Sequence, residues 1–243
     1  MQAIILAAGA SRRLRPLTDS TPKCLLNIGR KNLLQRTIEN VLDNGIDDFI
    51  FVTGYRENMI RDFINDNFPA LKRTFITNSD FENNNNSYSL WMTKDHLKDD
   101  IILLDSDILF DGRIIAKLLN SRNENCLAVN FTKELDEEQI KVIIDPENIV
   151  TDIGKHISIP LSAGESIGIE KFSSYFMKDL FVILNRKIVK ENNVNEFYEA
   201  SFQEVIDNGD PRNSIYAVNV AEFTCTEIDT VQDYENAQKI LIK

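Results

Sequence analysis

The sequence predicts an α/β protein in which a mixed, mainly parallel sheet lies between two layers of helices, with a small antiparallel and helical extension. Three observations predict this class. Residues 4–8 form a short, nearly continuous apolar run, which is typical of a strand buried on both faces of a parallel sheet. Helical and strand-like patterns then alternate over the first half of the chain, as in βαβ units. A length of 243 residues suits one large domain with an insertion.

The individual elements follow from the same patterns. After the first strand, helical spacing at residues 33–43 and 57–67 alternates with strand-like patterns at 48–53 and 73–77. Further helices are predicted at 87–97, 174–190, 196–207 and 231–241, and further strands at 101–104, 126–131, 139–144, 149–153, 214–218 and 221–226. The asparagine run at 83–86 is expected to be a surface loop, because asparagine favours turns.

Charge and composition exclude several classes of protein. The chain has 27 Lys plus Arg against 38 Asp plus Glu, a formal charge of −11. This balance argues against non-specific binding to nucleic acid or to an anionic membrane, which needs excess positive charge on one face. No apolar run approaches the ~20 residues of a membrane span, and the opening residues do not resemble a signal peptide. The three cysteines lie far apart, so we expect reduced thiols and a cytoplasmic protein.

A first candidate site follows the opening strand, because ligands of an open parallel sheet bind beyond the carboxyl ends of its strands. Backbone N–H groups of a small-residue turn can approach phosphate oxygens closely, and Arg13 and Lys23 can neutralise phosphate charge. By composition alone, an ordinary turn with solvated arginines explains the segment about equally well. The residues of the turn are Leu6, Ala7, Ala8, Gly9, Ala10 and Ser11.

A second candidate site consists of acidic residues at strand ends. Asp105 and Asp107 follow the strand predicted at 101–104, and two such carboxylates can face one hard divalent ion such as Mg²⁺. Taken alone, an acidic turn that ends a strand is the more common explanation. Glu227 and Asp229 lie before the last predicted helix, where Asp229 could also serve as its N-cap.

Together these residues resemble the nucleotidyltransferases that join a nucleoside monophosphate from an NTP to a phosphorylated small molecule and release pyrophosphate. The opening signature of that family is a Leu-Ala-Ala-Gly turn, then Arg-Leu, Pro-Leu-Thr and Pro-Lys at fixed spacing, and this chain has all four between Leu6 and Lys23. Ser11 stands where the family usually has a second glycine. The resemblance runs essentially end to end. It is closest to bacterial phosphocholine cytidylyltransferases and aminoalkylphosphonate cytidylyltransferases, through residues 85–90, 105–107 and 227–234.

The resemblance implies a Rossmann-like fold and one domain, 1–243. Within it, 1–125 would be the NTP-binding half, 126–220 an acceptor-binding extension, and 221–243 a metal-ligand strand with a closing helix. The implied activity is transfer of CMP from CTP to a small phosphorylated or phosphonylated amino alcohol. The expected partners are CTP and this acceptor, without nucleic acid or membrane, in a monomer or homodimer.

The resemblance also implies roles for individual residues. Asp107 and Asp229 would hold Mg²⁺ with help from Glu227, and Lys23, Arg13 and Asp107 would be catalytic. The nucleotide-binding residues would be Leu6, Ala7, Ala8, Gly9, Ala10, Ser11, Arg13, Lys23, Asn78, Ser79 and Asp105. The reaction needs no general base, because a phosphate monoester is largely dianionic at neutral pH, its second pKa being about 6.

The acceptor would be selected by its cation, which carboxylates or an aromatic face can hold. The expected acceptor-binding residues are Ser87, Tyr88, Glu165, Tyr198 and Glu199. Trp91 and Phe202 are further aromatic candidates, but their helical spacing favours the core. We predict that the segment 164–169 is a wall of the acceptor site and that Glu165 faces the acceptor.

Three alternatives compete with this interpretation. A sugar-1-phosphate nucleotidyltransferase would share the signature and the metal carboxylates and would differ in its acceptor. A glycosyltransferase could use residues 105–107 to hold the metal of a nucleotide sugar. That function leaves the joint presence of Gly9, Arg13, Pro22 and Lys23 unexplained. A non-catalytic nucleotide sensor would be favoured by loss of Lys23 or of a metal carboxylate, and all are present.

Overall fold

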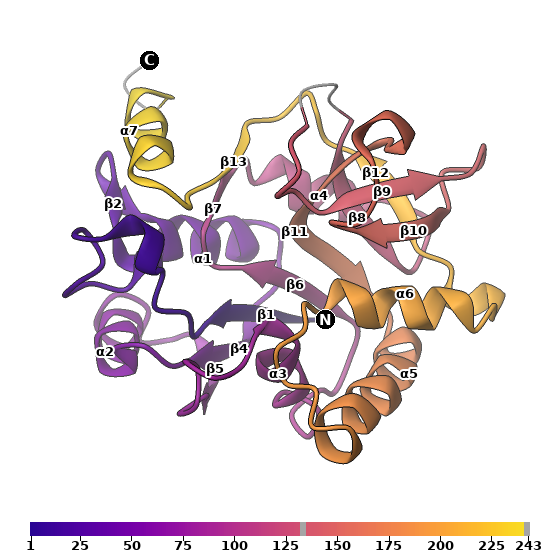
Figure 1. Ribbon diagram of the computed structural model, residues 1–243. Helices are drawn as coiled ribbons and strands as arrows, with labels where there is room; N and C mark the ends of the chain where they lie inside the picture. Colours follow the sequence, from indigo (N-terminus) through magenta and orange to yellow (C-terminus); the bar gives the residue numbers. More distant parts are fainter. Residues whose placement is uncertain (132–134, 241–243) are drawn as a thin grey trace.

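The centre of the structure, a computed structural model that describes residues 1–131 and 135–240, is a parallel sheet. Its parallel strands are β1 (Gln2–Ala7), β4 (Asp48–Thr53), β5 (Lys72–Thr77) and β6 (Ile101–Asp105), in the order β6-β1-β4-β5. β1 pairs with β4 on one side and β6 on the other, so the strand that opens the chain is interior to the sheet (Figure 1). All of its residues are buried. The predicted α/β class and the buried first strand are therefore confirmed.

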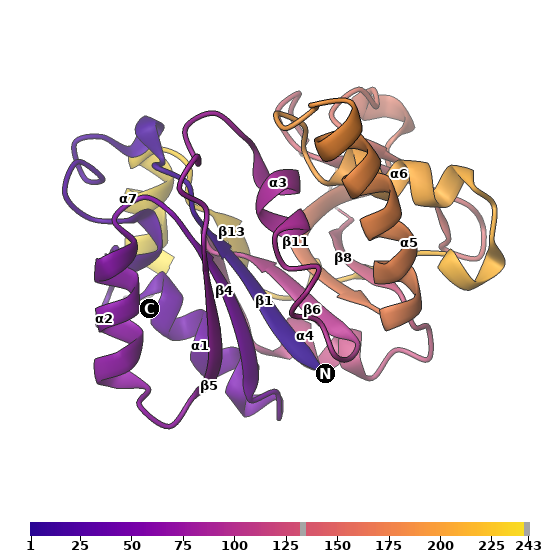
Figure 2. The ribbon, with the colours of Figure 1, turned by 90° about the horizontal axis from the view of Figure 1, so that it is seen from below.

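Helices cover both faces of this sheet (Figure 2). On one face the core contains Ile5 of β1 and side chains of the first, second and fourth helices, and on the other Ile4 and Leu6 meet the third, fifth and sixth. Each such aliphatic side chain contributes about 1.5–3 kcal/mol on burial, so both layers hold the strand ends in place. These helices are α1 (Leu33–Asp43), α2 (Glu57–Asn67), α3 (Asn86–Trp91), α4 (Arg113–Leu119), α5 (Ser174–Asn185) and α6 (Glu199–Asp207).

One long antiparallel strand, β11 (Gly164–Phe172), joins the extension to the parallel sheet. One of its edges pairs with β8, while the other pairs with β9 near its start and with β6 from Ile169 onward. The other strands of the extension are β8 (Cys126–Asn130), β9 (Lys141–Ile144), β10 (Val150–Gly154) and β12 (Tyr216–Asn219). The pattern did not predict β11, because Glu170 and Lys171 interrupt its apolar run although both are buried.

Several helix boundaries differ from the prediction. The helix expected at 87–97 ends at Trp91, because the N–H and hydroxyl groups of Thr93 both donate to the carbonyl of Leu90 and tighten the chain into a turn. A π-helical turn, Arg186–Lys190, follows α5 within the helix predicted at 174–190. α6 begins at Glu199 rather than at 196, and α4 was not predicted. The closing helix α7 (Val231–Ile240) was expected, and position 241 lies outside the described residues.

The last part of the chain returns to the carboxyl edge of the parallel sheet. β13 (Cys225–Glu227) pairs antiparallel with β7 (Ile108–Phe110), and Glu227 lies opposite Ile108. A further short hairpin, β2 (Asn27–Ile28) and β3 (Lys31–Asn32), precedes α1. Among the described residues, no helix is both long and apolar enough to cross a membrane.

Candidate active site

The three carboxylates predicted to hold a metal come together at the carboxyl end of β6. Asp107 follows that strand, and its carbonyl accepts a hydrogen bond of 3.0 Å from the N–H group of Ile228, which lies between Glu227 and Asp229. One oxygen of each carboxylate lies within 4.8 Å of the others. Burial and the negative charges of Asp107 and Asp229 raise the pKa of Glu227 to about 8. A divalent cation would relieve this repulsion, and an all-oxygen donor set suits Mg²⁺.

Lys23 lies at the same place. Its Nζ is 2.8 Å from Oδ2 of Asp107 and 2.6 Å from Oδ1 of Asp229, and the residue is only 8% exposed. Burial disfavours the ammonium form, but the charges of the two carboxylates outweigh it and raise the pKa of Lys23. Arg13 forms a second ion pair with Asp229 and is itself exposed. The predicted catalytic residues Lys23, Arg13 and Asp107 therefore form one charged cluster.

The turn after β1 is a tight loop that is closed by its own hydrogen bonds. Ser11 takes φ 46° and ψ 55°, the left-handed conformation that glycine adopts at low cost, so serine keeps the local turn. The hydroxyl group of Thr18 donates to the carbonyl of Ser11 at 2.9 Å and closes the loop. Behind the turn, a Cβ atom at Gly54 would lie 2.7 Å from the carbonyl oxygen of Ala8, so only glycine fits there.

A cavity of about 290 Å³ opens beside this turn. Among the predicted nucleotide-binding residues, Ala10 and Ser79 are not part of its lining. The predicted residues that line it are Leu6, Ala7, Ala8, Gly9, Ser11, Arg13, Lys23, Asn78 and Asp105. Asn78 is 1% exposed, and its Nδ2 donates to Oδ1 of Asn84 at 2.7 Å and to Oγ of Ser89 at 3.1 Å.

The asparagine run also contributes to this cavity. We expected 83–86 to be a surface loop, but Asn84, Asn85 and Asn86 line the cavity together with Phe81. Asn85 caps the short helix α3 by accepting from the N–H group of Asn86. The signal that could have located these residues is the segment 85–90, which carries the resemblance and includes Asn85 and Asn86.

A second cavity, of about 780 Å³, lies between the strand ends and the extension. Glu165 and Glu199 line it, as does the whole stretch Ser166–Gly168, so the wall predicted at 164–169 does face a cavity. Burial raises the pKa of both Glu165 and Glu199 to about 7. Asp136 and Glu138 add further acidic side chains, and the fully buried Lys141 supports their loop by donating to the carbonyls of residues 136, 137 and 139.

The other predicted acceptor residues lie elsewhere. Ser87 is 2% exposed, Tyr88 packs beside Trp91, and neither lines this cavity. Tyr198 is fully buried, with its ring stacked on Phe202 at a centroid distance of 4.9 Å, so its face is closed to an acceptor. Its hydroxyl group donates to Asp105, which lines both cavities, so Tyr198 is connected to the site through that residue, and its role in acceptor binding stays a prediction.

The sequence interpretation missed an aromatic residue, Phe197. It is 42% exposed and lines both cavities, whereas its neighbour Tyr198 lies in the core. The Nζ atom of Lys155 lies 5.0 Å from the ring centroid of Phe197 and 3.2 Å from a carboxylate oxygen of Glu138. Nothing in the local pattern separates these adjacent aromatics, although both fall in the stretch predicted as the helix 196–207.

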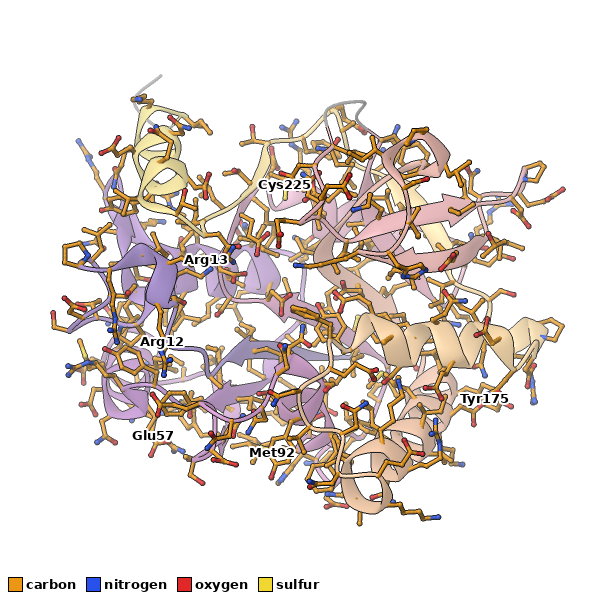
Figure 3. All side chains as sticks on the ribbon, viewed as in Figure 1. Arg12, Arg13, Glu57, Met92, Tyr175 and Cys225 are labelled. Atoms are coloured by element: carbon orange, nitrogen blue, oxygen red, sulfur yellow. The ribbon has the colours of Figure 1, made fainter. Side chains whose placement is uncertain are left out.

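The two cavities share a wall. The shared residues are Arg13, Asn86, Asp105, Asp107, Phe197, Glu227 and Asp229. Figure 3 labels Arg13, on the loop after β1, and Cys225, on β13; both line the second cavity although they come from opposite ends of the chain. A small-residue turn, a buried lysine and three converging carboxylates between two cavities form an arrangement that could bring two anionic ligands together. The fold and this arrangement are those expected of an α/β enzyme that acts on nucleotide phosphates.

Comparison with known proteins identifies the family. The model of the nucleotidyl transferase family matches residues 2–140, and the chain belongs to that family. The choline-phosphate cytidylyltransferase of Streptococcus pneumoniae is 27% identical over 246 residues, covering 99% of this chain and 98% of that protein. The CTP:phosphoglutamine cytidylyltransferase of Campylobacter jejuni is 28% identical over 254 residues, covering 97% and 98%.

A search of solved structures agrees on the fold. The CTP:phosphocholine cytidylyltransferase from Streptococcus pneumoniae aligns with a TM-score of 0.81 and 24% identity, covering 99% of this chain and 98% of that one. This similarity extends across the extension as well as the parallel sheet. The fold that the resemblance implies is therefore confirmed over the whole chain.

Proposed function

We propose that this protein transfers CMP from CTP to a small phosphorylated or phosphonylated amino alcohol, of the phosphocholine or 2-aminoethylphosphonate type, and releases pyrophosphate. The observation that carries the proposal is the position of Lys23, whose ammonium group lies between Asp107 and Asp229 where the two cavities meet. A buried cation there faces the phosphate charge of both reactants. The similarity to two cytidylyltransferases supports CTP as the donor.

The residues suggest a division of labour. CTP would occupy the cavity beside the turn after β1, with Lys23 and Arg13 at its phosphates. The acceptor would occupy the second cavity, and its dianionic oxygen would attack the α-phosphorus in line with the departing pyrophosphate, without a general base. Asp107, Asp229 and Glu227 would hold Mg²⁺, which supplies charge neutralisation and orientation when it is bound.

The charge of the second cavity supports an amine-bearing acceptor. Its acidic residues are Asp105, Asp107, Asp136, Glu138, Glu165, Glu199, Glu227, Asp229 and Asp233, and its basic residues are Arg13 and Lys155. Three of the carboxylates are assigned to the metal, but the others still outnumber the cations. A neutral sugar would gain little from this excess, whereas a cationic tail would gain electrostatic energy.

The test is a measurement of pyrophosphate release with Mg²⁺ across CTP, UTP, dTTP, GTP and ATP. Each nucleotide is paired with phosphocholine, 2-aminoethylphosphonate, glucose-1-phosphate or no acceptor. Release with CTP and an amine-bearing acceptor is expected. Release only with glucose-1-phosphate would keep the reaction type and reject the acceptor, and dependence on another nucleotide would reject CTP.

A further inference from the structure

Part of the wall of the second cavity is neither helix nor strand. It belongs to the connection between β8 and β9, and we call residues 136–139 of this connection the 136–139 loop. Asp136, Glu138 and Gln139 of the loop line the cavity. Oδ1 of Asp136 accepts from the N–H groups of Glu138 and Gln139, and Oε1 of Gln139 accepts from the N–H group of Asp136. These bonds shape the loop but do not attach it to the sheet.

Lys141, the first residue of β9, makes that attachment. Its side chain is fully buried, and Nζ donates to the carbonyls of Asp136, Glu137 and Gln139 at 3.2, 3.3 and 3.0 Å. An ammonium group has three N–H donors, so these carbonyls can satisfy all of them. Glu165, which lines the cavity, lies opposite Lys141 in the pairing of β9 with β11. Side chains of opposite residues project from the same face of a sheet, so Lys141 reaches the loop from the face that adjoins the cavity.

Burial alone does not require a lysine at this position. The next residue of β9, Val142, is apolar and fully buried. A methionine would fill a volume similar to that of Lys141 without the free-energy cost of taking a charge out of water. Within the described residues, the ammonium group binds backbone carbonyls rather than a carboxylate. What the charge adds is therefore the attachment of the loop.

Other buried lysines have different partners. Lys171 donates to one carbonyl, that of Ser121, at 3.2 Å. Lys187 pairs with Glu196 and Glu204. Neither set of partners belongs to the described lining of the second cavity, whereas two of the three carbonyls that Lys141 binds come from residues that line it.

We propose that Lys141 is a positioning residue for the acceptor: its ammonium group fixes the 136–139 loop as a wall of the second cavity, and acceptor affinity depends on this wall. The inference rests on the proposed function, in which the acceptor occupies this cavity. Lys141 is not in the described lining, so it acts through the loop. The described lining of the cavity beside the turn after β1 contains no residue of the loop, so CTP affinity should not depend on Lys141.

The test is the steady-state kinetics of Lys141→Met. The acceptor is whichever of phosphocholine, 2-aminoethylphosphonate and glucose-1-phosphate gives the fastest pyrophosphate release with CTP and the wild-type protein. The KM for this acceptor is expected to rise at least about tenfold, and the KM for CTP to change by less than about twofold. Equal rises in the two KM values would overturn the inference, and so would an unchanged KM for the acceptor.

Lys171→Met is the matched control, because it also removes a buried ammonium group that donates to a backbone carbonyl. Both variants are expected to lose stability, which melting curves measure. Only Lys141→Met is expected to raise the KM for the acceptor. The same rise in Lys171→Met would show that a general loss of stability causes it, and the positioning role would be rejected.

A measurement on the wild-type protein decides if Lys141→Met does not fold. The ammonium group of Lys141 is buried and hydrogen-bonded, so its ¹⁵Nζ signal in a ¹H–¹⁵N correlation spectrum should be protected from exchange with water. Adding the acceptor in the presence of Mg²⁺ and α,β-methylene-CTP, which blocks turnover, should shift this signal and leave that of Lys171 in place. An unshifted Lys141 signal at saturating acceptor would overturn the inference.

Turnover separates this inference from the proposed function. Release with phosphocholine, together with an unchanged acceptor KM in Lys141→Met, would leave the proposed function standing and reject the role of Lys141. Release only with glucose-1-phosphate would reject the proposed acceptor. The kinetics of Lys141→Met with glucose-1-phosphate would then still decide whether the 136–139 loop positions the acceptor.

Discussion

The hydroxyl group of Tyr198 donates a hydrogen bond to Oδ2 of Asp105, with an O–O distance of 2.9 Å. The bond joins the start of α6 to the end of β6, two elements from different halves of the chain. Gly168 also lies close to this carboxylate, with φ 68°, and a Cβ atom there would be 3.0 Å from Oδ2. Asp105 is therefore held in one orientation between the parallel sheet and the extension.

Tyr198→Phe tests this bond. The substitution leaves the ring in the core but removes the only described side-chain donor to Asp105, so the free energy of unfolding should fall by about 1–3 kcal/mol. Urea denaturation measures the change. Tyr175→Phe is the matched control, because its hydroxyl group donates to Asp210 at the surface and should contribute less. Equal decreases in the free energy of unfolding of the two variants would show that the bond to Asp105 stabilises the protein no more than the bond to Asp210 does.

Lys23→Met should reduce turnover by at least about 100-fold, because it removes a preorganised cation from the developing phosphate charge. The substitution also leaves Asp107 and Asp229 without their shared partner, so stability should fall and rates must be measured where circular dichroism shows a folded variant. Lys31→Ala breaks a surface ion pair with Glu39 and serves as the control. Turnover of Lys23→Met near the wild-type rate would remove Lys23 from the mechanism.

Asp107→Asn should lower the affinity for Mg²⁺ or Mn²⁺ by more than about tenfold in calorimetry, because one of three converging carboxylates loses its charge. EDTA should stop pyrophosphate release by the wild-type protein, and added Mg²⁺ should restore it. Asp111→Asn is a nearby control, since Asp111 pairs with Arg113 on the surface. Unchanged metal binding in Asp107→Asn would place the metal site elsewhere.

The buried Glu199 predicts a pH dependence of stability. Burial raises its pKa from 4.5 to about 7, so between these values the folded protein holds a proton that the unfolded chain releases. The contribution of this bound proton to the free energy of unfolding is fully present below about pH 4.5. It is lost as the pH rises through about 7, and the loss is on the order of 3 kcal/mol at most. Glu199→Gln should therefore gain stability relative to the wild type between pH 5 and pH 8. The same change of melting temperature with pH in the wild type and in Glu199→Gln across this range would contradict the prediction.

The parallel sheet and the charged cluster were open to prediction because they depend on local signals. Apolar runs define the buried strands, and Asp107 follows one of them at the carboxyl edge of the parallel sheet. Lys23 and Asp229 do not end parallel strands, and their roles were predicted from the resemblance to the family. Phe197 was missed because the choice between it and Tyr198 depends on packing against Phe202. Long-range packing therefore decides which of two adjacent aromatics reaches the cavity.

β11 shows the same limit for a whole element. The buried Glu170 and Lys171 make its sequence look like a surface segment. Lys171 donates to the carbonyl of Ser121, a partner far away in the chain, which makes the burial of a charged residue in the strand possible. A pattern of apolar residues contains no information about such a partner, so the strand became apparent only from its pairing with β6 and β8.

The pairing of β13 with β7 also has a consequence for incomplete chains. A polypeptide cut before Glu227, by a premature stop or by a protease, would keep every parallel strand and the turn after β1. It would nevertheless have one of the three converging carboxylates, and Lys23 would keep Asp107 but lose Asp229 as a partner. The cut would also remove Ile228 and Ala237, which share an apolar cluster with Leu14 in the loop after β1. The final segment therefore supplies both carboxylates to the site and apolar support to the opposite end of the chain.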